Sequence, residues 1–137
     1  MPDPEIKLAV LCDDVRQEVG NKFSLMGLFD RFGVSDFTQS LPSFRVFIKM
    51  HFLTEGEHRF ALNVRSGEGD FSVGLQGVLS ATEKEQASGR YSAHLNIGFN
   101  QLKVPREGVY NIEIVCDDKS VASIPFQVAT VRPPTLQ

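Results

Sequence analysis

Two Cys-Asp-Asp segments, Cys12-Asp13-Asp14 and Cys116-Asp117-Asp118, are the most distinctive groups of potentially chemical residues in the chain. Both fall at or near the ends of predicted strands, so four carboxylates would converge if those ends shared one edge of the fold. Such oxygen clusters hold calcium and other hard cations in proteins. The alternative is a hairpin turn at one segment and a solvated strand end at the other, where Asp is favoured for its side-chain hydrogen bonds. The spacing matches no compact metal-binding loop, so we predict no metal and no other cofactor. The candidates for a metal site, if there is one, are Asp13, Asp14, Asp117 and Asp118.

The histidines and cysteines offer little further chemistry. His51 and His94 fall on the polar faces of their predicted strands and His58 on an apolar face, so a shared zinc site is not expected, and surface or turn positions explain all three. Cys12 and Cys116 fall on apolar faces and are predicted to be buried thiols that face inward. Two cysteines are too few for a disulfide framework.

Sequence signatures of known enzymes are absent. The chain has no Gly-x-Ser-x-Gly, no phosphate-binding Gly-x-x-x-x-Gly-Lys, no His-Glu-x-x-His and no Cys-x-x-Cys. We therefore predict that the protein is not an enzyme. If it has an unfamiliar active site, the first residues to test are Asp13, Asp14, His51 and His94.

A possible interaction surface lies on the strand predicted over Phe44 to Leu53. Phe47 stands on the otherwise polar face of that strand, and a large apolar side chain on a solvent face is typical of a partner interface, particularly beside Arg. The candidate surface consists of Arg45, Phe47, Lys49 and His51. The equally supported alternative is that a loop such as Ser35 to Ser43 covers Phe47.

Alternation of apolar and polar residues with a period of two runs through the whole chain, and helical periodicity is almost absent. The alternation, separated by Gly, Asn and Asp turns, predicts about eight strands. They are Lys7 to Arg16, Phe23 to Phe29, Phe44 to Leu53, His58 to Ser66, Phe71 to Gln76, Tyr91 to Phe99, Val109 to Cys116 and Val121 to Val128. We expect loops at Ser35 to Ser43 and at Thr82 to Gly89.

These strands predict an all-β fold. Most neighbours are expected to form antiparallel hairpins, including one around Gly56 that pairs Phe52 with Phe60, Met50 with Leu62 and Ile48 with Val64. A sheet with one apolar face needs a cover, and without helices the cover is a second sheet or closure into a barrel. We predict a single antiparallel β-sandwich domain over residues 1–137, with residues 1–5 and 130–137 as short extended tails. A barrel is the second choice.

The composition narrows the choice of partner and location. A formal net charge of −3 argues against nucleic-acid binding, which needs a clustered excess of Lys and Arg. The N-terminus has no basic start, and its apolar run from Leu8 to Cys12 is too short for a signal peptide core or a membrane span. We therefore expect a cytoplasmic protein with no membrane partner.

Several segments resemble a family of small bacterial proteins of about this length that have no assigned function. The matching segments are Leu8 to Arg16, Leu25-Met26-Gly27-Leu28-Phe29-Asp30-Arg31, Pro42-x-Phe44 and Gly108-x-Tyr110, so the resemblance spans most of the chain. It implies a β-sandwich and brings no catalytic residue, cofactor or partner with it.

Three functions follow as hypotheses. The first is a non-enzymatic module that binds itself or another protein through a sheet face or strand edge. The second is a small-ligand, carbohydrate or calcium binder that uses the acidic strand ends. The third is an enzyme with an unrecognised site, which would have to be argued from a site.

Overall fold

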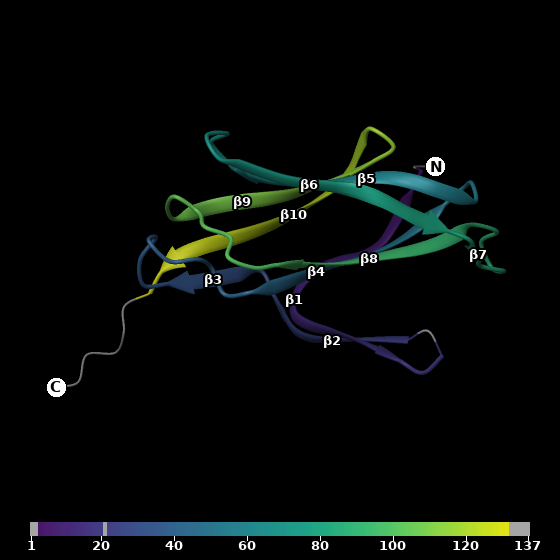
Figure 1. The fold of residues 1–137 in the computed structure, drawn as a ribbon, viewed down its shortest axis with the longest axis horizontal. Helices are drawn as coiled ribbons and strands as arrows, with labels where there is room; N and C mark the ends of the chain where they lie inside the picture. The colour runs from purple at the N-terminus through teal and green to yellow at the C-terminus, as the bar shows by residue number, and fades with distance from the viewer. Residues whose placement is uncertain (1–2, 21, 132–137) are drawn as a thin grey trace.

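The computed structural model describes residues 3–20 and 22–131. Ten strands and no helix are found in this part of the chain (Figure 1), so it also contains no helix long and apolar enough to cross a membrane. The strands are β1 (Glu5–Glu18), β2 (Lys22–Phe29), β3 (Arg31–Val34), β4 (Phe44–Phe52), β5 (Gly56–Ser66), β6 (Ser72–Ala81), β7 (Glu83–Lys84), β8 (Tyr91–Phe99), β9 (Gly108–Cys116) and β10 (Lys119–Thr130).

The strands form two five-stranded sheets packed face to face, which confirms the predicted all-β sandwich. The first sheet has the order β2-β1-β4-β8-β7, and all its neighbours are antiparallel. The second sheet has the order β3-β10-β9-β5-β6. It is antiparallel except for β3, which pairs with β10 in parallel. Figure 1 shows the two layers, with β5, β6, β9 and β10 above β4 and β8.

The core lies between the two sheets and is built by the alternation that predicts the strands. On β4 the core residues Phe44, Val46, Ile48, Met50 and Phe52 are all at most 2% exposed. Contacts across the layers include the Cys116 Sγ atom 3.7 Å from the Met50 Sδ atom, and the Phe44 ring 6.4 Å from the Phe126 ring between centroids.

The predicted hairpin between β4 and β5 is wrong. β4 lies in the first sheet between β1 and β8, whereas β5 lies in the second sheet between β9 and β6. The apolar faces of the two strands therefore meet across the core, and the Phe52 ring stacks on the His58 ring with centroids 3.8 Å apart. The alternation shows which face of each strand is buried, but it fits two strands that oppose each other across a sandwich as well as two paired in one sheet.

Two short strands are absent from the prediction. β7 lies inside Thr82 to Gly89, which we expected to be a loop, and it pairs Glu83 with Ser92 and Lys84 with Tyr91. β3 pairs only with the distant β10. Strands this short are too short to show a period-two pattern in the sequence. They form because a neighbouring strand of the fold pairs with them. The predicted loop at Ser35 to Ser43 contains no strand.

The ends of the sandwich differ slightly from the predicted tails. Glu5 already belongs to β1 and Thr130 still belongs to β10, so each strand runs one residue into a predicted tail. The Asp3 side chain accepts a hydrogen bond from the Leu53 amide at 3.0 Å. Residues 1–2 and 132–137 of the predicted tails lie outside the described residues.

The part of the β1–β2 hairpin nearest its turn folds over the outer face of the first sheet. Phe23 of β2 contacts Phe47 of β4 and His94 of β8, with ring centroids 5.1 Å and 4.4 Å away, although β1 separates β2 from β4 in the sheet. In Figure 1 this part of the hairpin lies beneath β4 and β8. We call residues 13–18 and 22–27 the hairpin arm.

Candidate interaction surface

The structure does not bring the four candidate aspartates together. Asp13 and Asp14 lie on β1, where Asp14 pairs with Met26. Asp117 and Asp118 form the turn beyond Cys116, at the other end of the sandwich, where Cys116 contacts Met50 and Met50 pairs with Ile6. From Ile6 to Asp13 the strand covers about 20 Å, since a strand rises about 3.3 Å per residue. In the described residues no group of three or more His, Cys, Asp or Glu side chains is placed to hold a metal ion.

Asp117 and Asp118 form the predicted turn, and Asp117 also holds a histidine. Their φ angles are +48° and +67°, which is the backbone of a two-residue type I′ hairpin. The Asp117 carboxylate accepts a hydrogen bond from the Arg59 amide at 3.0 Å and lies 2.6 Å from the Nδ1 atom of His58. The Nε2 atom of His58 lies 3.0 Å from the Thr54 carbonyl oxygen. Both ring nitrogens of His58 therefore face acceptors, so the arrangement favours the doubly protonated imidazolium.

This geometry makes stability depend on pH. Burial lowers the pKa of His58, but the hydrogen bonds to Asp117 and Thr54 outweigh it and raise the pKa above its usual 6.5. Because folding raises the pKa of His58, protonated His58 stabilises the folded state fully below pH 6.5. This stabilisation is lost as the pH rises through the pKa of His58 in the folded protein. We expect the melting temperature to fall by a few degrees between pH 6.5 and 8, below the range in which cysteines of the unfolded chain ionise.

The Asp117→Asn variant is expected to remove this fall. Asn tolerates the left-handed conformation of the turn and would donate its amide N–H to a neutral His58. Thermal unfolding of both proteins from pH 6.5 to 8 tests this, and parallel curves would contradict it. His94 does not interfere, because burial and Lys49 lower its pKa below 6.5, outside this range.

The predicted interaction surface around Phe47 is mostly not free. Phe47 is 3% exposed because the hairpin arm covers it, rather than the loop Ser35 to Ser43. Arg45 lies along the sheet, with its Nε donating to the Asn96 side chain at 2.6 Å, and Lys49 is exposed. A groove of about 360 Å³ remains beside Phe47, with Lys22 and Lys49 at its rim.

His51 is buried, and its predicted surface position is wrong. It is 2% exposed, with its Nε2 atom 3.0 Å from a Glu85 carboxylate oxygen. The segment before β8 folds over this end of β4 and also buries Arg90, whose guanidinium donates to the His51 carbonyl at 3.4 Å. Sequence reasoning missed Glu85 and Arg90, because the segment was expected to be an exposed loop.

Both cysteines are buried free thiols, as predicted, but only Cys116 faces the core, so the predicted inward orientation of Cys12 is wrong. Cys116 lies in the core, and burial raises its pKa to about 11. Cys12 is in register with Arg45 on the outer face. A register shift between Ile6 and Leu8 causes this, because it moves Leu8, Val10 and Cys12 to the outer face of β1. Burial also raises the pKa of Cys12, so both groups are thiols at neutral pH.

One edge of β6 pairs with no other strand of the sandwich. β6 is the last strand of the second sheet and pairs only with β5. Its sequence from Ser72 to Ala81 contains no charged residue and has glycines at 74 and 77. Val73 and Val78 are 41% and 58% exposed. An uncharged and extended edge of this kind is a template for pairing with another strand.

The backbone of β6 offers regular hydrogen-bonding groups along this edge. The Ser66 amide of β5 donates to the Phe71 carbonyl, and the β5–β6 register continues without a bulge to Gly56 and Ala81. Since the backbone groups of an antiparallel strand alternate in direction, odd-numbered residues of β6 face β5. The amides and carbonyls of the even-numbered residues face outward, and these are Ser72, Gly74, Gln76, Val78 and Ser80.

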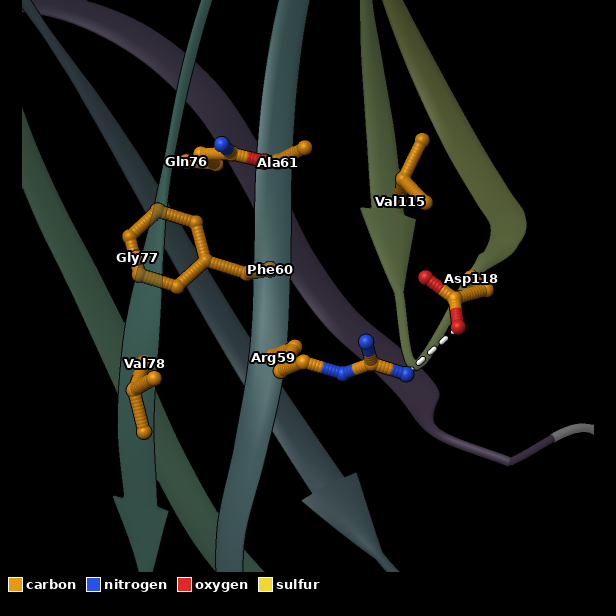
Figure 2. Close-up of a pocket in the computed structure, with 8 residues that line it drawn as sticks. All are labelled: Arg59, Phe60, Ala61, Gln76, Gly77, Val78, Val115 and Asp118. Atoms are coloured by element: carbon orange, nitrogen blue, oxygen red, sulfur yellow. Dashed lines mark hydrogen bonds and ion pairs between the residues drawn. The ribbon is translucent and has the colours of Figure 1, made fainter.

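A shallow hollow lies on the outer sheet face directly beside this edge. It has a volume of about 330 Å³ and forms because the small side chain of Ala61 is flanked by longer ones. Figure 2 shows Gln76 and Val78 on the β6 side of the hollow, Val115 on the other side, and Arg59 paired with Asp118 at one end. A strand added to β6 would have an apolar surface beside it.

The other strand edges in the described part of the chain are blunted. β3 has four residues and begins with Arg31, and β7 consists of Glu83 and Lys84. β2 begins with Lys22, and Gly27 breaks its extended backbone with a φ of +69°. The part of β8 beyond β7 contacts β6 of the opposite sheet. Short length, charge and backbone kinks are common protections of edge strands, and β6 has none of them, so its contact with β8 is its protection in the described residues.

Comparison with known proteins places the chain in a family. The model of a family of unknown function (DUF6941) matches residues 7–129. The chain belongs to this family. The match confirms the resemblance noted from the sequence, and it assigns no activity. No protein with a curated description matches the chain.

A solved structure aligns with most of this chain. It is Pseudomonas fluorescens alkylpurine DNA glycosylase AlkC bound to DNA containing an abasic site analog. The alignment covers 94% of this chain and 31% of that chain, with 7% sequence identity and a TM-score of 0.47. The chain thus spans less than a third of that protein, and the likeness carries no conclusion about function.

Sequence reasoning missed β6 as a functional element. Phe71, Val73 and Leu75 identify it as a strand, but nothing local distinguishes an edge strand from a central one. The available signal was the absence of charge over ten residues, combined with two glycines. That signal gains meaning only when the sheet order places β6 at an edge.

Proposed function

We propose that the protein is a non-enzymatic interaction module that binds an extended protein strand along the free edge of β6. The observation that carries the proposal is the uncharged edge of β6, whose outward amides and carbonyls, from Ser72 to Ser80, pair with no other strand in the described part of the chain. In strand addition, these backbone groups supply affinity and the adjacent side-chain surface supplies specificity. The hollow around Ala61 is that surface.

A photo-crosslinking experiment tests this function. A photoreactive p-benzoylphenylalanine in place of Val78 stands beside the edge, and the same residue in place of Val109 is the matched control. Val109 is similarly exposed, 54% against 58%, but it lies on β9, which has neighbours on both sides. After irradiation in a lysate of the source cells, we expect a discrete protein adduct at position 78 and none at position 109. Mass spectrometry identifies the captured protein, and equal or absent labelling at the two positions would refute the proposal.

A further inference from the structure

We infer that the strand that β6 accepts is β6 of a second copy of this chain, paired antiparallel about a two-fold axis at Gln76. The inference rests on the proposed function and names its partner. Two copies would then join their second sheets into one continuous sheet across the dimer.

The hydrogen-bonding groups of β6 are compatible with such a pair. The outward residues all have even numbers, and a two-fold axis at Gln76 places every even residue opposite another even residue. Ser72 then faces Ser80 of the second copy, Gly74 faces Val78, and Gln76 faces itself. Each opposed pair exchanges two backbone hydrogen bonds, as in an ordinary antiparallel ladder. A two-fold interface of this kind uses the same patch on both copies.

The extent of the pairing favours this register over its neighbours, because Gln76 lies near the middle of β6. With the axis at Gln76, Val78 lies opposite Gly74, Leu75 opposite Gly77 and Val73 opposite Leu79. The side chains of Asn63 and Phe60 of β5 lie over the two glycines. The pairing uses residues 72–80 and leaves out only the fully buried Ala81. An axis at Gly77 would set two glycines against each other, and an axis at Leu75 would extend the pairing into the Gly67–Asp70 turn.

Charge and exposure also favour a second copy. The protein has a net charge of −3, so two copies repel wherever their charged faces meet, but no charged residue lies between Ser72 and Ala81. Self-pairing would cover the exposed side chains of Val73 and Val78. An interface confined mainly to one strand edge falls at the small end of specific interfaces, so we expect dissociation in the micromolar range.

A charge exchange at the two-fold axis tests the inference. Gln76→Lys and Gln76→Glu each place two like charges opposite each other, so each variant alone should dimerise about ten-fold more weakly than the wild type. Mixing the two variants places unlike charges together and should restore the dimer. The control is Gln127→Lys, an exposed glutamine on the outer face of β10, which should dimerise as the wild type does. Sedimentation from about 1 to 500 µM measures each constant, and thermal unfolding confirms that each variant is folded.

Cysteine crosslinking tests the register independently. Opposed residues that exchange hydrogen bonds lie about 5.5 Å apart between Cα atoms, within reach of a disulfide. Gln76→Cys should therefore form a covalent dimer on mild oxidation. Val78→Cys should not, because the two copies of residue 78 lie about 13 Å apart along the strands. Cys12 and Cys116 are buried and stay unreactive in both variants.

The outcomes separate the inference from the proposed function. A wild-type protein that is monomeric up to about 500 µM, or crosslinking at 78 in preference to 76, overturns the two-fold pairing. If position 78 then captures a different protein by photo-crosslinking, the proposed function stands without self-pairing. If it captures nothing, both are overturned.

Discussion

The Phe44→Ala variant is expected to lower the free energy of unfolding by about 4 kcal/mol, the largest effect that we expect of a single substitution in this protein. Phe44 is 2% exposed and joins the two sheets. Its ring stacks on Phe99 of the first sheet, 5.1 Å between centroids and 6° from parallel, and lies 5.1 Å from Phe32 of the second sheet. Alanine would leave a cavity that rings held from both sides cannot fill. Because a domain has only about 5–15 kcal/mol of stability, this loss is a large part of the total.

Urea unfolding of the variant measures this loss. The control is Phe71→Ala, which removes the same ring from a half-buried position beside Tyr110 and should cost clearly less. A loss below about 1 kcal/mol for Phe44→Ala would show that the aromatic cluster is not the centre of the core.

The Phe47→Ala variant is expected to lower the free energy of unfolding by about 3 kcal/mol and to loosen the hairpin arm. The Phe47 ring is 3% exposed beneath Phe23 of the arm, and the two rings are 5.1 Å apart between centroids. Removing it takes away the surface on which the arm packs. Amide hydrogen exchange over residues 13–18 and 22–27 should therefore accelerate more than exchange in β9.

This variant separates a structural role for Phe47 from an interfacial one. A side chain that only anchors a partner contributes little to stability, so a change within about 0.5 kcal/mol would favour the interface. Val78→Ala is the control for that behaviour, since Val78 is 58% exposed on the free edge. A double-mutant cycle with Phe23→Ala measures the contact itself, and we expect a coupling of about 1 kcal/mol.

The comparison of His51 and His58 shows what the alternation of apolar and polar residues can and cannot predict about burial. Alternation correctly places His58 on the apolar face of its strand, beside Phe60 and Leu62, but the predicted surface or turn position is wrong, since His58 is 6% exposed. It places His51 on the polar face, which is also correct, but that face is covered by the segment that holds Glu85 and Arg90. Periodicity reports the direction of a side chain relative to its own strand, whereas exposure depends on what another part of the chain lays over that face.

The two Cys-Asp-Asp segments show the same limit for a candidate site. The turn at Asp117 and Asp118 could be predicted, because two consecutive residues that tolerate positive φ between two apolar runs favour a type I′ hairpin. The separation of these residues from Asp13 and Asp14 could not, because it depends on how β1 and β9 lie in different sheets. The role of Asp117 in holding His58 is likewise a contact between distant segments.

The sequence by itself determined the fold class, the positions of the main strands and the core face of β4, since these follow from local alternation and turn chemistry. Tertiary structure alone decided that β4 and β5 lie in opposite sheets, that the hairpin arm covers Phe47, and that β6 is an edge. The physical reason is that a strand presents the same hydrogen-bonding groups along both edges whatever its sequence. Which edge is paired, and which is left free for a partner, depends on which other strands of the folded chain form hydrogen bonds with those groups.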